Sequence, residues 1–162
     1  MRFDFAMKTI HVETITLNLS KEEDSVRVLF NDENIILKDQ TVDAVHALIE
    51  TNFGIVVNHF NSMVNNSKDL FDSEDLNQIS VLVVLHYIYM YNSWRINHRK
   101  HENEGLIFQH KDFDNPSTHD LLFHYFKHKY PDYWEQQCAI LLGMNVLELR
   151  NYYKSREDFY SK

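Results

Sequence analysis

The chain is poor in cysteine, glycine and proline: its 162 residues include 1 Cys, 3 Gly and 2 Pro. A single cysteine, Cys138, excludes an internal disulfide, a zinc ribbon and a CxxC redox site. Few glycines leave little room for a phosphate-binding loop or a GxSxG nucleophile elbow, and the sequence contains neither motif. We therefore expect a reducing, cytoplasmic setting and a protein that is not an enzyme, with no catalytic residue and no cofactor.

Long hydrophobic runs are also missing. The most apolar stretch, residues 79–91 (ISVLVVLHYIYMY), is shorter than the ~20 residues that a membrane helix needs. The first residues, MRFDFAMKTI, lack the continuous apolar segment of a signal peptide. We expect no membrane partner and interpret residues 79–91 as the buried centre of a helix in a soluble protein.

Positive charge is scarce, since 16 Lys and Arg stand against 24 Asp and Glu, for a formal net charge of −8. The excess is confined to residues 1–116, which hold 10 basic and 18 acidic side chains, whereas residues 117–162 hold 6 of each. Nucleic-acid-binding proteins usually carry a basic surface, because neutralising phosphates supplies much of their affinity. The acidic part of this chain would repel DNA, and the neutral C-terminal part would not.

Apolar residues make up 44% of the chain and aromatic residues 14%, enough to fill a core. Alternating polarity over residues 8–19, 25–30 and 34–39 predicts a small antiparallel β meander. The alternation changes phase at Glu13–Thr14, which indicates either a bulge or two short strands. The sequence thus predicts an α+β fold, in which this meander and helices precede a C-terminal tri-helical unit.

Helical spacing of apolar residues predicts a helix over 42–64, which Gly54 would break or bend. A second helix is expected from a Ser73 cap to about residue 98, with Trp94 among its buried residues. We interpret Asp75 as one of the solvated acidic residues at the start of this helix. The domain organisation predicted is an acidic α+β domain over 1–108, a linker over 109–117 and a helical unit over 118–162.

Helix signals are dense in the C-terminal unit. Ser117 and Asp120 have the spacing of a capping box for a helix over 118–129. Pro131 ends that helix and starts the next, which runs to Gly143. A third helix is expected from Asn145 to about residue 158.

The last two helices meet within residues 135–154, EQQCAILLGMNVLELRNYYK. Gly143 follows Ala139 after four residues, and Leu149 follows after six more. A small residue lets helices approach closely, a glycine accepts a left-handed turn, and an apolar residue fills the angle between them. The segment resembles a helix-turn-helix motif, and the preceding helix supplies the third member of a tri-helical DNA-binding unit.

The resemblance implies a small DNA-binding transcription regulator that acts as a dimer. Its recognition helix would begin at Asn145, since arginine can read guanine and asparagine adenine in the major groove. The residues assigned to DNA binding are Gln136, Asn145, Leu147, Arg150, Asn151 and Lys154. Further contacts, to backbone phosphates, would come from Gln137, Lys127, Lys129 and Arg156.

A plain helical hairpin ended by a glycine cap is the alternative interpretation of this segment. The net charge then favours an acidic inhibitor of the immunity or counter-defence type, which binds and blocks a basic protein. The acidic residues expected to act there are Glu22, Glu23, Asp24, Asp72, Glu74 and Asp75. Under either hypothesis we expect a homodimer or a protein partner.

The ten histidines allow a third alternative, a metal-dependent protein. His124 and His128 have the i, i+4 spacing of metal ligands on a helix, and His46 is the candidate third ligand. No HExxH motif occurs, so we interpret these histidines as exposed or interfacial and predict no metal ligand. The tail aromatics either pack back on the chain or form a dimer surface; they are Tyr152, Tyr153, Phe159 and Tyr160.

Overall fold

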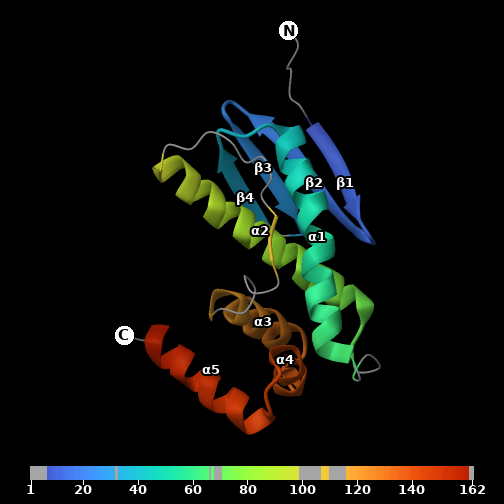
Figure 1. Cartoon of the computed structure of the whole chain (residues 1–162), viewed down its shortest axis with the longest axis vertical. Coiled ribbons are helices and arrows are strands. Elements are labelled where there is room, and N and C mark those ends of the chain that lie inside the picture. Colours follow the sequence, from blue (N-terminus) through green and yellow to red (C-terminus); the bar gives the residue numbers. More distant parts are fainter. Residues whose placement is uncertain are drawn as a thin grey trace.

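A four-stranded antiparallel sheet followed by five helices forms the structure, an α+β arrangement as the sequence predicted (Figure 1). The computed structural model describes residues 7–31, 33–65, 67, 71–98, 107–109 and 116–160, with the backbone alone for 158–160. The elements are β1 (Met7–Val12), β2 (Ile15–Glu22), β3 (Ser25–Phe30), β4 (Glu33–Lys38), α1 (Val42–Val64), α2 (Ser73–Asn97), α3 (Pro116–Lys129), α4 (Trp134–Leu142) and α5 (Val146–Tyr160).

The sheet is a simple meander in the order β1-β2-β3-β4. The phase change in the N-terminal sequence separates two strands rather than marking a bulge, because Val12 pairs with Ile15 across a two-residue turn. Glu13, Glu23 and Asn31 open the three hairpin turns with positive φ angles of 56°, 55° and 52°. Such turns match the twist of the strands that they join, so each hairpin register is set locally.

One face of the sheet packs on α1 and α2, with α1 over β1 and β2 and α2 along β4 (Figure 1). Alternate strand residues point to these helices, which follows from the two-residue period of a strand. The inward strand residues that are buried are Ile10, Val12, Ile15, Leu17, Leu19, Val26, Val28, Phe30 and Leu37. The core thus lies between one sheet face and two long helices.

A buried hydrogen-bond network around Arg95 attaches α2 to the end of β4. Arg95 is 1% exposed. Its Nη2 donates to the carbonyl oxygens of Lys38 and Asp39 at 3.1 and 3.2 Å and to Asn92 Oδ1 at 3.0 Å. Gln40 Nε2 donates to the same Asn92 oxygen at 2.7 Å. A buried cation costs free energy unless it is hydrogen-bonded, so these acceptors determine where α2 can lie.

Several local expectations differ from the structure. Trp94 is 46% exposed rather than buried, and its ring stacks on those of Tyr91 and His98. Asp72, not Ser73, caps α2 by accepting a hydrogen bond from the Glu74 amide at 2.9 Å. α1 runs without a break through its glycine.

The C-terminal helices pack against the ends of α1 and α2 that lie beyond the sheet (Figure 1). α3 contacts α2, α4 contacts α1, and α5 lies on the outside. Most of the predicted 109–117 linker lies outside the described residues, so the domain division stays a prediction. In the ranges that the structure describes, no helix has the length and apolarity to cross a membrane.

Candidate functional site

The Asp75 carboxylate links α2 to the end of α3, in addition to the 2.7 Å hydrogen bond between Tyr87 Oη and Thr118 Oγ1. Asp75 is 1% exposed, so it is not the solvated helix-start residue that the sequence suggested. Tyr125 Oη donates to its Oδ1 and Tyr130 Oη to its Oδ2, each at 2.6 Å. The Lys129 ammonium forms a short ion pair with Oδ1. All three donors lie on α3 or immediately after it, so this cluster fixes the position of α3.

The cluster favours the ionised form of Asp75. Burial acts to raise the pKa of this carboxyl, but hydrogen bonds from Lys129, Tyr125 and Tyr130 outweigh it and hold the pKa below its usual value. Burial likewise opposes the charge on Lys129, and its bonds to Asp75 and Tyr125 nevertheless raise the pKa of the ammonium. The buried Asp75 and the exposed Lys129 therefore both stay charged at neutral pH.

The corner between α4 and α5 has the local geometry that its spacing predicted. Gly143 has a left-handed φ of 68°. The Met144 amide donates to the Ala139 carbonyl at 2.9 Å, and that of Gly143 to the Ile140 carbonyl at 3.2 Å, which closes α4. Ala139 is 3% and Leu149 0% exposed, so both lie in the angle between the helices.

A capping box at the start of α5 uses the side chain of Asn145, one of the residues predicted to read bases. The Glu148 amide donates to Asn145 Oδ1 at 2.8 Å, and the Asn145 amide donates to Glu148 Oε1 at 3.3 Å. Reciprocal bonds of this kind satisfy amides that the first helical turn leaves free. The Asn145 oxygen therefore serves as the helix cap in this structure.

Arg150 is also held by a partner within the chain. Its Nε donates to Glu135 Oε2 on α4 at 2.8 Å, and this bond raises the pKa of the guanidinium. The pair bridges the two helices on the outer side of the corner. Arg150 would have to leave Glu135, or share it, to place its fork on a guanine.

The other predicted base contacts are exposed. Gln136 on α4 and Asn151 and Lys154 on α5 are open to solvent. Leu147 is 66% exposed in the first turn of α5. Leu147, Arg150, Asn151 and Lys154 recur at helical spacing, so we call these four residues the α5 surface.

Most of the residues predicted to contact phosphates bond to other groups of the chain. Arg156 makes two bonds to Asp120 on α3, at 3.2 and 2.7 Å. Lys127 donates to Tyr153 Oη at 2.6 Å and lies over that ring. Lys129 is bound to Asp75, and Gln137 is 8% exposed. The cations of α3 therefore stabilise the unit itself.

Aromatic residues join α5 to α3. His119 Nδ1 and Tyr152 Oη are hydrogen-bonded at 2.7 Å, and the rings of Tyr152 and Tyr153 meet Phe123 edge-on. Trp134 packs edge-on against Tyr153 from α4. The two tyrosines of the tail thus pack back on the chain, while the side chains of Phe159 and Tyr160 lie outside the described residues.

The histidine pair on α3 has no third ligand from the candidate helix. The rings of His124 and His128 lie 4.3 Å apart, and His46 forms an ion pair with Glu50 on α1. Across the described residues, no three His, Cys, Asp or Glu side chains are placed to hold a metal ion. Cys138 is fully buried, and burial raises the pKa of its thiol, which leaves it a packing role.

The comparisons with known proteins found no similarity: no protein-family model, no curated protein and no solved structure matches the chain. The function must therefore be argued from the residues of the chain alone.

The Asp75 cluster predicts a pH-dependent loss of stability in Asp75→Asn. We expect about 2–4 kcal/mol less unfolding free energy at pH 7, because the amide turns a donor toward groups that also donate. The folded pKa of Asp75 lies below its unfolded value, so its stabilisation is complete above the unfolded value, about 4, and is lost as pH falls further. Urea unfolding from pH 7 downward should show the two proteins converging; a constant difference would contradict the assignment.

The corner predicts opposite effects for two glycine-to-alanine changes. Gly143→Ala should lower the free energy of unfolding by about 1–2 kcal/mol, because a left-handed φ strains an L-residue. A Cβ there would also lie 3.2 Å from Met63 Cε. Gly54→Ala, in the middle of α1 with open space around it, should raise the free energy of unfolding by about 0.5–1 kcal/mol. Thermal unfolding of both variants tests this, and equal shifts would contradict it.

Proposed function

We propose that the chain is a protein-binding module whose α5 surface contacts a protein partner. One observation carries this proposal: Arg150 on α5 and Asn145, the residue before α5, bond within the chain, whereas Leu147 on α5 is 66% exposed. An apolar side chain at the outer face of a helix suits insertion into an apolar pocket of another protein. It has little to offer the polar edges of DNA bases except a thymine methyl group.

The charges support the same proposal. Four cations of the C-terminal unit bond to groups of the chain itself: Lys127, Lys129, Arg150 and Arg156. Each would have to give up that bond, in whole or part, to neutralise a phosphate. The net charge of −8 instead favours approach to a basic protein surface. A partner that offers an apolar pocket to Leu147 and a basic patch to the acidic residues within 1–116 fits both properties and is consistent with an inhibitory role.

DNA binding by a dimeric regulator is the second candidate, and the corner geometry favours it. The left-handed Gly143 and the buried Ala139 and Leu149 occupy the positions expected in a helix-turn-helix. Reading a guanine would still require the Arg150 guanidinium, whose Nε is bonded to Glu135, to leave that carboxylate or share it with a base. That exchange makes this the less favoured of the two functions.

A photo-crosslinking residue at position 147 tests the proposal. Leu147→p-benzoylphenylalanine, expressed in the source cells and irradiated, should give one predominant protein adduct. The matched control is Ile36→p-benzoylphenylalanine, at a residue 41% exposed on the outer face of the sheet. It should not give that adduct.

The captured partner must then be purified and titrated. We expect Leu147→Glu to weaken its binding at least about tenfold, since a buried anchor contributes more than 1 kcal/mol, and Ile36→Glu to leave it unchanged. Nucleic-acid adducts from position 147, or equal binding by Leu147→Glu and the unchanged protein, would contradict the proposal.

A further inference from the structure

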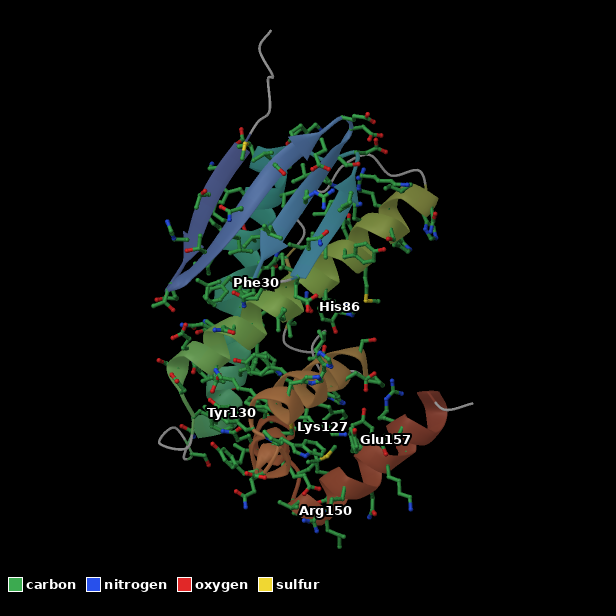
Figure 2. All side chains as sticks on the ribbon, turned by 180° about the vertical axis from the view of Figure 1, so that it is seen from behind. Phe30, His86, Lys127, Tyr130, Arg150 and Glu157 are labelled. Carbon is green, nitrogen blue, oxygen red and sulfur yellow. The ribbon has the colours of Figure 1, made fainter. Side chains whose placement is uncertain are left out.

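A cleft of about 420 Å³ lies between the β3–β4 turn and helices α2 and α3. Figure 2 shows Phe30 at the end of the sheet that faces these helices. The cleft is separate from the α5 surface, because none of its lining residues comes from α4 or α5. Its volume falls within the range of pockets that hold small organic molecules, about 300–1,000 Å³.

The floor of the cleft is apolar. Phe30 contributes a ring that is 2% exposed, and Leu82 and Leu121 are half-buried on α2 and α3. An aromatic or branched hydrocarbon body would remove the exposed parts of Leu82 and Leu121 from water together with its own surface, which is the main source of affinity in such pockets.

The α3 wall of the cleft is rich in cationic and hydrogen-bonding groups. His124, His128 and Lys129 line it together. The Nδ1 of His128 lies 3.0 Å from the His124 carbonyl oxygen, which can only accept, so that nitrogen carries the proton in this bond. The Nε2 of His128 is left for another partner and becomes a donor when the ring is protonated. This wall favours an anionic group.

The opposite wall differs in chemistry. Asn31 and Glu33 come from the β3–β4 turn and its following strand, and Gln78 from α2. Glu33 would repel an anion from this side, so a ligand with one anionic group has a preferred orientation. Its charge would lie at the α3 wall and its apolar body across Phe30.

We propose that this cleft binds a small organic anion with an aromatic or apolar body. The body packs on Leu82 and Leu121 next to Phe30, and the anionic group accepts hydrogen bonds from His124 and His128; Lys129 lines the same wall, with its ammonium paired with Asp75. Such a ligand would bridge the sheet and α3, and thereby join the N-terminal layer to the helices that carry the α5 surface.

Two fluorescent probes that share one aromatic skeleton test the proposal. The anionic probe is 8-anilinonaphthalene-1-sulfonate, and the neutral one is N-phenyl-1-naphthylamine, which lacks the sulfonate. Both should bind saturably to the folded full chain. The sulfonate should bind about tenfold more tightly at about pH 5.5 than at about pH 8, because imidazoles gain protons over this range. The neutral probe should show no such preference.

The other titratable side chains that line the cleft are Glu33, Tyr125 and Lys129. Burial raises the pKa of Tyr125, and hydrogen bonds to Asp75 and Tyr125 raise the pKa of Lys129 against the opposing effect of burial. The double variant His124→Gln, His128→Gln should therefore abolish the pH preference for the sulfonate and leave binding of the neutral probe unchanged. A pH preference that survives in this variant would overturn the placement of the anionic group.

Variants that fill the cleft show whether the probes bind there. Leu121→Trp and Leu82→Trp obstruct it from α3 and from α2, and each should weaken both probes at least about tenfold, since packing of the apolar body is lost. Ile36→Gln, on the outer sheet face, should have no effect. Cooperative thermal unfolding of each variant, at both pH values, confirms that it is folded. Full binding by a folded cleft-filling variant, or no binding by the unchanged chain, would overturn the proposal.

Discussion

The buried Asp75 carboxylate is the interaction on which the arrangement of the C-terminal helices depends. It lies in the first turn of α2 and is bound by Tyr125, Lys129 and Tyr130, fifty or more positions along the chain. A charge removed from water is tolerated only where such partners surround it. Because all three donors lie at the end of α3 or immediately after it, the cluster holds α3 on α2, and α4 and α5 pack on α3, with α4 also packed on α1. The α5 surface and one wall of the cleft therefore share this anchor.

The internal bonds of the C-terminal unit also decide how its function is interpreted. A helix-turn-helix spacing tells which residues face outward but not what those residues already bind. Here Arg150 crosses to Glu135, Asn145 caps its own helix, and Arg156 holds Asp120. These bonds stabilise the angle between the helices by using the groups that would otherwise read or neutralise DNA. Leu147 is left exposed, and an exposed apolar residue on a rigid helix is suited to a protein interface.

Local features were predictable from sequence, and long-range ones were not. The alternation of the strands, the apolar spacing over 42–64 and the left-handed turn at Gly143 depend on neighbouring residues, so the sequence carries them directly. Asp75 resembled a solvated helix-start residue because its partners lie far along the chain, and the hydrogen-bond network around Arg95 was missed for the same reason. Periodicity predicts that Trp94 is buried, but the side chain is 46% exposed. Apolar spacing identifies a helix reliably and does not show which turns of that helix other elements cover. The cleft is lined by residues of β3, β4, α2 and α3, so no single stretch of the sequence predicts it.

We propose that the outward side of α5 recognises a protein rather than DNA. The most direct test is retention on a random-sequence duplex pool at low and moderate salt, with the unchanged chain and Arg150→Ala side by side. We expect no enriched sequence, and any weak retention at low salt should disappear at moderate salt, because it would be purely electrostatic. Enrichment of a defined site, above all a palindromic one, that Arg150→Ala fails to select would instead identify α5 as a DNA-recognition helix.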